Sequence, residues 1–143
     1  TEEIFQPFMY PNPFLQTTTT GGGALACSAA IAAINVTIRD RLWEAAEEKG
    51  NYIIPRVQEL AAKYPKVYSK VTGKGLLIGQ HFQTPEIGGA VAAALFKRGV
   101  LVAGTLTSAQ TIRIEPPLVI TYDEINQGLD ALKGAVEEIA GTL

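Results

Sequence analysis

Residues 111–118 form a short apolar run, TIRIEPPL, that holds one arginine and one glutamate and ends in two prolines and a leucine. Side chains of a β-strand alternate between its two faces, so this run predicts a strand with Ile112 and Ile114 toward a core. Arg113 and Glu115 then share the opposite face. The two prolines have no backbone N–H to donate to a neighbouring strand, so strand pairing is expected to end at them.

The arginine of this strand has two interpretations. A guanidinium held on a rigid element at the edge of a cleft matches a carboxylate, because its planar fork offers two parallel hydrogen bonds. Arg113 is therefore a candidate residue for binding a substrate carboxylate. The alternative is a local ion pair with Glu115 on a solvated face, and such surface pairs are common and weak. The pattern alone leaves both interpretations open.

Composition limits the class of protein. The chain has 143 residues, of which 47% are hydrophobic, which is enough for one globular domain with a core. The formal net charge of -2 gives no basic surface, so neither nucleic acid nor an anionic membrane is an expected partner. No apolar run approaches the ~20 residues that a membrane-spanning helix needs. With one cysteine, Cys27, and one histidine, His81, we expect no disulfide, no metal site and a reducing, cytoplasmic compartment.

Residues 1–23 show neither a helical nor an alternating pattern, because three prolines interleave with four aromatic residues. We expect an irregular segment that lies against another body, since exposed aromatic side chains need a partner surface. Within it, residues 17–23 are four threonines followed by three glycines, directly before a helical pattern. Hydroxyl and backbone N–H donors at a helix N-terminus form an anion site that phosphate often occupies. A flexible polar linker is the alternative.

Two helices are expected next, over residues 24–39 and 40–64. The first is rich in alanine, and its Cys27 is interpreted as a buried packing residue, because no histidine or lysine lies next to it. The second contains Gly50 and Pro55. A proline inside a helix lacks one hydrogen-bond donor, so a kink or a short break is expected there.

The rest of the chain predicts a small sheet covered by helices. In chain order we first expect a hairpin over residues 67–82, which forms the sheet's central pair, and a helix over residues 84–99, which starts at Thr-Pro-Glu and ends at glycine. A short buried strand over residues 100–103 then pairs with the 111–115 strand. The last helix, over residues 121–143, starts at a capping box. His81, on the second strand of the hairpin, is expected to be structural or on the surface.

Three separated motifs occur along the chain: the threonine and glycine tract that leads into Leu25-Ala26-Cys27, the turn Gly73-Lys74-Gly75-Leu76, and residues 100–118. Together they resemble the C-terminal part of the class III pyridoxal-phosphate (PLP) aminotransferases. Within that family the resemblance is closest to the putrescine aminotransferases, while ornithine and acetylornithine aminotransferases show a looser Arg-x-x-Pro-Pro-Leu form. The resemblance extends from Asn12 onward.

The resemblance implies an α/β (α+β) fold, the C-terminal small domain of a fold type I PLP-dependent transferase. Such a domain has a short, largely antiparallel sheet covered by helices and preceded by a long linking helix. Residues 1–23 then are an interface and phosphate-loop segment of the large domain, and residues 24–143 are the linking helix and the small domain. The resemblance also implies that Thr19 contacts the phosphate of PLP in the partner subunit of a homodimer, and that Arg113 faces the substrate carboxylate.

The implied reaction moves an amino group from a diamine or ω-amino donor, such as putrescine, to 2-oxoglutarate. The implied partners are therefore a small amine and a 2-oxo acid. Three alternatives stay open: an aminotransferase of the ornithine or acetylornithine type, a stand-alone α/β module that binds a carboxylate through Arg113, and an interaction domain that docks through residues 4–14.

Two features depart from the family pattern. Where relatives have an aromatic residue and then Gly-Gly-Asn-Pro, this chain has Thr20 and then residues 21–24, Gly-Gly-Gly-Ala. The Schiff-base lysine, the aspartate that pairs with the pyridine nitrogen and the glycine-rich phosphate cup lie upstream in the family, and the chain opens on Thr1. We therefore expect a fragment of a longer enzyme, without a catalytic residue of its own and inactive by itself.

Overall fold

The computed structural model describes residues 1–9, 18–105, 108 and 110–143. These residues belong to two compact units, Thr1–Asp40 and Arg41–Leu143, which are described one at a time. The expectations for the aromatic residues Tyr10 and Phe14 and for Thr17 lie outside the described residues.

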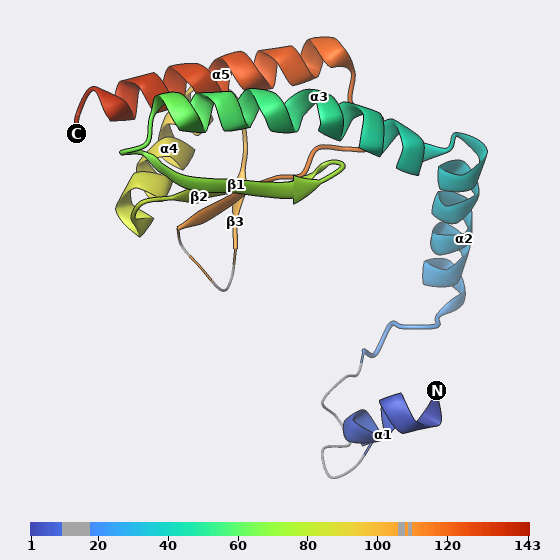
Figure 1. Ribbon diagram of the computed structural model, residues 1–143. Helices are drawn as coiled ribbons and strands as arrows, with labels where there is room; N and C mark the ends of the chain where they lie inside the picture. The colour runs from blue at the N-terminus through green and yellow to red at the C-terminus, as the bar shows by residue number, and fades with distance from the viewer. Residues whose placement is uncertain (10–17, 106–107, 109) are drawn as a thin grey trace. The chain divides into compact units, whose positions relative to one another are not determined.

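Among its described residues, the second unit has a four-stranded sheet with three helices on one face (Figure 1). Neighbouring strands are antiparallel and follow the order β1-β2-β4-β3. The strands are β1 (Tyr68–Lys74), β2 (Leu77–Phe82), β3 (Ala103–Gly104) and β4 (Thr111–Ile114). The helices are α3 (Leu42–Lys63), α4 (Pro85–Lys97) and α5 (Tyr122–Ala140). The expected fold class, a short antiparallel sheet covered by helices, is confirmed.

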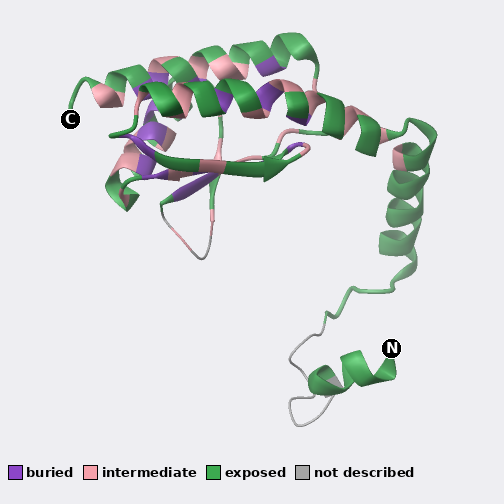
Figure 2. Ribbon diagram, viewed as in Figure 1, coloured by how far each residue is buried: buried purple, intermediate pink, exposed green. Residues whose placement is uncertain are grey.

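The core lies between the helices and the sheet face that they cover (Figure 2). On β2 the buried residues recur with period two, while on the helices they recur with a period near 3.6, so each element turns one apolar side inward. Burying one such side chain contributes about 1.5–3 kcal/mol. The fully buried apolar side chains include Val57, Ile78, Phe82, Val91, Leu95, Ala135 and Val136.

The hairpin of β1 and β2 forms as expected, but it is not the centre of the sheet. β4 pairs with the other side of β2, with Ile78 opposite Ile114 and Gln80 opposite Ile112, so β1 lies at an edge. The central pair is therefore β2 and β4. Alternation within one strand does not reveal which distant strand lies beside it, and this explains the incorrect expectation.

Helix α3 runs without a break, so the short break considered near its middle does not occur. Gly50 is buried against the backbone of Gly75 in the hairpin turn, where a Cβ atom would collide with that backbone. Pro55 costs the helix one backbone hydrogen bond. Its neighbours Ile53 and Val57 are buried in the core, and their packing offsets that cost.

The ends of α4 and α5 follow the expected caps. Thr84 accepts a hydrogen bond from the backbone N–H of Ile87 at 3.3 Å, and Gly99 takes a positive φ of 79° just after α4. At the start of α5, Thr121 and Glu124 form the capping box, with bonds of 2.8 Å and 3.3 Å between side chains and backbone N–H groups.

The strand expected over residues 100–103 is shifted and is not buried. It is β3, Ala103–Gly104, which pairs with β4 as expected but lies exposed at the sheet edge. Leu101, just before it, is 84% exposed. An edge strand has a neighbour on one side only, so an apolar run there does not guarantee burial.

The first unit contains α1 (Glu2–Met9) and α2 (Ala24–Arg39). The expectation of an irregular N-terminal segment is wrong for α1. The Thr1 hydroxyl accepts a hydrogen bond from the N–H of Ile4 at 3.5 Å, and Glu2 and Glu3 occupy the first turn, where negative charge is favourable. Pro7 lies near the C-terminal end of this short helix, where it removes only one hydrogen bond.

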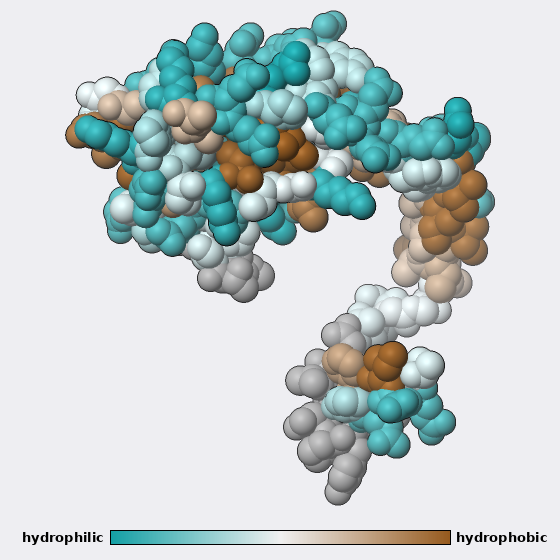
Figure 3. Space-filling model, in the orientation of Figure 1, coloured by the Kyte–Doolittle hydropathy of each residue, from teal (hydrophilic) through white to brown (hydrophobic). Residues whose placement is uncertain are grey.

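Helix α2 has the expected bounds, but Cys27 is exposed rather than buried. No residue of α2 is buried, and its apolar side chains, among them Leu25, Ile31 and Ile34, are exposed (Figure 3). Helical periodicity identifies the helix but not what covers it, which explains the wrong expectation for Cys27.

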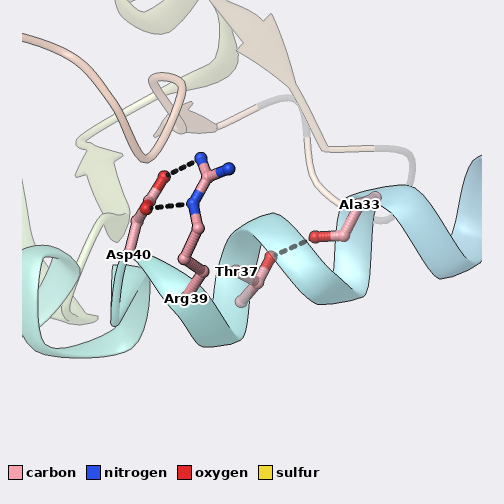
Figure 4. Close-up of polar contacts among 4 residues, drawn as sticks. All are labelled: Ala33, Thr37, Arg39 and Asp40. Atoms are coloured by element: carbon pink, nitrogen blue, oxygen red, sulfur yellow. Dashed lines mark hydrogen bonds and ion pairs between the residues drawn. The ribbon is translucent and has the colours of Figure 1, made fainter.

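The C-terminal end of α2 is held by local polar contacts (Figure 4). The Thr37 hydroxyl donates to the carbonyl of Ala33 at 2.8 Å. Arg39 donates two hydrogen bonds to Asp40, at 2.7 Å and 2.8 Å, and these bonds lower the pKa of the Asp40 carboxyl. Both side chains are exposed, so the pair contributes little to stability.

Candidate functional site

Arg113 lies on the sheet face opposite the helices. Its neighbours across the two ladders of β4 are Gly79 on β2 and Ala103 on β3, and neither has a large side chain. Ile112, one residue earlier, is only 3% exposed, as expected for a strand whose side chains alternate between faces. The local sequence therefore holds Arg113 on a rigid strand, with small residues on both sides of it.

Arg113 pairs with Glu115, as the second interpretation of the sequence predicted. Its Nη1 atom lies 3.2 Å from Oε1 of Glu115, and the two side chains are 41% and 37% exposed. A pair this exposed is worth about 0–1 kcal/mol. The Nε atom of Arg113 is buried and has no hydrogen-bond partner among the described residues. The ion pair uses Nη1 and the guanidinium is partly exposed, so the pair does not exclude carboxylate binding.

Two hollows border this part of the strand. The first, of about 620 Å³, is lined largely by apolar residues of segment 99–103, of α5 and of the core, together with Arg113 and Glu115. The second, of about 610 Å³, is lined by residues such as Trp43, Leu77 and Leu118, and again by Glu115. Glu115 therefore lines both hollows.

His81 joins three strands on the same face as Arg113. One ring nitrogen lies 2.9 Å from the hydroxyl of Thr72 on β1, and the other lies 3.0 Å from the hydroxyl of Thr111 on β4. Burial and the nearby charge of Lys70 lower the pKa of His81, so the neutral ring is favoured near pH 7. These contacts agree with the structural role expected for His81.

Thr19 lies in an exposed turn before α2. Residues 19–22 are bends and turns, Gly22 has a φ of 77°, and Gly23 is the N-cap of the helix. No side chain caps α2, so its first-turn N–H groups are free of side-chain acceptors among the described residues. Hydroxyls and free N–H groups form a donor set for a phosphate. Thr19 belongs to the first unit and Arg113 to the second.

The sequence interpretation missed Gln80, a fully buried polar residue of β2. Its Oε1 atom accepts a hydrogen bond from the hydroxyl of Tyr68 at 2.8 Å, and burial raises the pKa of that hydroxyl. Its Nε2 atom has no partner among the described residues. The signal was present, because Gln80 stands at period two between Ile78 and Phe82, which places it on the core face.

Two features are absent from the described residues. Within those residues, no helix is both long and apolar enough to span a bilayer. The same residues hold no group of three or more histidine, cysteine, aspartate or glutamate side chains arranged to bind a metal ion.

An antiparallel sheet with helices on one face, together with the long helix α2 before it in the chain, corresponds to the small domain of a fold type I transferase. The sequence comparison specifies the family. The model of the class III aminotransferases matches residues 1–136, so the chain belongs to that family.

Solved structures of this family resemble the chain. An acetylornithine aminotransferase from Elizabethkingia anophelis is 32% identical, with a TM-score of 0.73 over 86% of this chain and 32% of that chain. A lysine aminotransferase from M. tuberculosis is 28% identical, with a TM-score of 0.78 over 96% of this chain and 31% of that chain. An ornithine aminotransferase from Plasmodium yoelii is 27% identical, with a TM-score of 0.76 over 87% of this chain and 33% of that chain. The chain thus spans about a third of the length of these relatives.

Proposed function

We propose that the enzyme containing this chain is a PLP-dependent aminotransferase that moves an amino group from a diamine or ω-amino donor, such as putrescine, to 2-oxoglutarate. The supporting observation is Arg113, which stands on the open face of the sheet between Gly79 and Ala103 with its side chain 41% exposed. A fixed guanidinium of this kind binds a carboxylate through charge-assisted hydrogen bonds. Family membership supports the reaction class.

The residues near the start of α2 fit the phosphate of PLP. The Thr19 hydroxyl supplies a donor, as do the first-turn N–H groups of α2, which no side chain of the described residues caps, and the positive end of the helix dipole favours an anion. When bound, PLP supplies the electron sink for amino-group transfer. In this proposal Thr19 holds the phosphate, and Arg113 orients the oxo acid by its carboxylate.

This chain contributes no catalytic lysine in the proposal. None of its lysines is buried, so none has the desolvated setting in which an amine becomes a nucleophile. The lysine that binds PLP then lies in another part of the parent enzyme. We propose that the chain by itself is inactive.

We also propose that the parent is a cytoplasmic homodimer with shared active sites, in which Thr19 contacts PLP of the partner subunit. The exposed apolar side chains of the first unit support a large contact surface there. They include Ile4, Phe5 and Phe8 of α1 and Ile31, Ile34 and Ile38 of α2. Apolar side chains of this size gather at obligate interfaces.

The test is amino-group transfer by the full-length enzyme that contains this chain. Putrescine, lysine, ornithine and acetylornithine are offered in turn as donors, and the product of 2-oxoglutarate is measured. We expect the highest kcat/KM with putrescine. No transfer from any of the four donors, with PLP bound, would contradict the proposed reaction.

A second candidate is an aminotransferase of the ornithine or acetylornithine type, which the similar solved structures favour. These donors bear a carboxylate that Arg113 is able to bind, whereas putrescine bears none. A higher kcat/KM with ornithine or acetylornithine than with putrescine would select this candidate.

A further inference from the structure

Glu115 lies beside Arg113 and pairs with its guanidinium. It follows β4 directly, beyond Ile114, the last residue of that strand. Its carboxylate reaches back to the guanidinium at 3.2 Å, and its side chain is partly exposed and lines both hollows. Pro116 comes next, and its fixed φ limits the freedom of the backbone there.

In the proposed reaction, an anionic acceptor and a cationic donor bind beside Arg113 in turn. The acceptor, 2-oxoglutarate, has two carboxylates, and a diamine donor has no carboxylate but a second ammonium. Arg113 attracts the first ligand and repels the second. A carboxylate beside the guanidinium removes this conflict, because it neutralises the arginine and accepts hydrogen bonds from an ammonium.

The geometry leaves Glu115 free to do this. Among the described residues its Oε1 atom pairs with Arg113, and a carboxylate has about four lone-pair sites over two oxygens. The pair is exposed and weak, so exchange between partners costs little.

We infer that Glu115 is a specificity-determining residue that receives the distal ammonium of a diamine donor. Arg113 binds the carboxylate of the acceptor in one half-reaction, and Glu115 binds the ammonium of the donor in the other. This inference rests on the proposed function and names the residue that selects a diamine over a donor bearing a carboxylate.

The test is Glu115→Gln in the full-length enzyme that contains this chain, with each half-reaction measured separately. We expect kcat/KM for putrescine to fall about 10- to 100-fold, mainly through KM, because the ammonium loses a charged acceptor. The half-reaction with 2-oxoglutarate stays within about twofold of wild type or improves, because the guanidinium loses a competitor. Glu115→Asp, which keeps the charge, restores part of the use of putrescine.

Glu138→Gln is the matched control. Glu138, on α5, forms a partly exposed ion pair with Arg98 at 2.8 Å, and neither residue lines the two hollows. We expect no change in the ratio of the two half-reactions in this variant.

The outcomes separate this inference from the proposed function. If Glu115→Gln lowers both half-reactions by the same factor, or lowers neither, the role given to Glu115 is wrong and the proposed reaction stands. If the wild-type enzyme does not use putrescine at all, the proposed donor is wrong, and the inference fails with it.

Discussion

Arg113 shows how a strand can separate structural from functional side chains residue by residue. Ile112 faces the core and Arg113 faces the open side, so changing the arginine leaves the apolar core residues unchanged. Its cross-strand neighbours Gly79 and Ala103 are small, which keeps the guanidinium accessible from the sheet surface. A residue in this position is able to change ligand binding with little effect on stability.

For the parent enzyme, Arg113→Ala is expected to raise KM for 2-oxoglutarate and to lower kcat/KM by about one to three powers of ten. The reason is the loss of a charge-assisted contact that an acceptor carboxylate makes and putrescine does not. Deamination of the amine in the first half-reaction is expected to suffer less. Single-turnover measurements of the two half-reactions test this. Equal losses in both would indicate a structural role for Arg113.

At the level of elements, close approach between α3 and the β1–β2 hairpin depends on Gly50. A Cβ atom there would meet the backbone of Gly75, and backbone atoms cannot move aside as a flexible side chain can. Gly75 itself has a φ of 55°, which suits glycine in the hairpin turn. Two glycines far apart in the sequence thus allow one helix to lie directly on the turn.

We expect Gly50→Ala to destabilise the chain by about 1–3 kcal/mol, even though alanine favours helices by about 1 kcal/mol over glycine. Gly89→Ala is the control, because Gly89 lies in α4 with no atom within 4 Å of the added Cβ. That variant is expected to be as stable as wild type, or more stable by up to about 1 kcal/mol. Denaturant unfolding of both variants measures the difference. A destabilised Gly89→Ala with an unchanged Gly50→Ala would show that the close contact is unimportant.

For the second unit, the sequence predicted where helices and strands lie better than it predicted which strands lie side by side. Local chemistry specifies a cap such as Thr121 with Glu124, so helix starts were correct. The pairing of β2 with β4 joins segments about 30 residues apart, as in His81 opposite Thr111, and no local pattern contains that information. The alternation along β2 places Gln80 on the core face, but its hydrogen bond with Tyr68 joins two strands and no local pattern predicts it.

At the scale of the whole molecule, the first unit presents apolar surface that no described residue covers. Helix α2 has no buried residue, and Cys27 and Leu25 are exposed. Periodicity predicted the helix, but it does not reveal which surface covers a helix, so burial was not predictable. The chain spans about a third of its relatives' length, and the proposed dimer supplies further surface.

The proposed dimer makes a prediction for the phosphate site. If Thr19 contacts the PLP phosphate of the partner subunit, Thr19→Ala in the parent weakens PLP retention. A charge-assisted hydrogen bond of this kind contributes about 1.5–3 kcal/mol, which corresponds to roughly 10- to 150-fold in PLP affinity. Equilibrium dialysis with PLP measures the affinity of the homodimer.

Complementation then tests whether the contact crosses the interface. A Thr19→Ala subunit is mixed with a subunit that lacks the PLP-binding lysine of the parent. In a mixed dimer, one site combines the intact lysine of the first subunit with the intact Thr19 of the second. We expect this site to restore up to about half of the wild-type activity per dimer, because one of the two shared sites is complete. Mixed dimers that stay as inactive as the lysine variant, while both homodimers keep normal PLP affinity, would show that Thr19 does not reach across the interface.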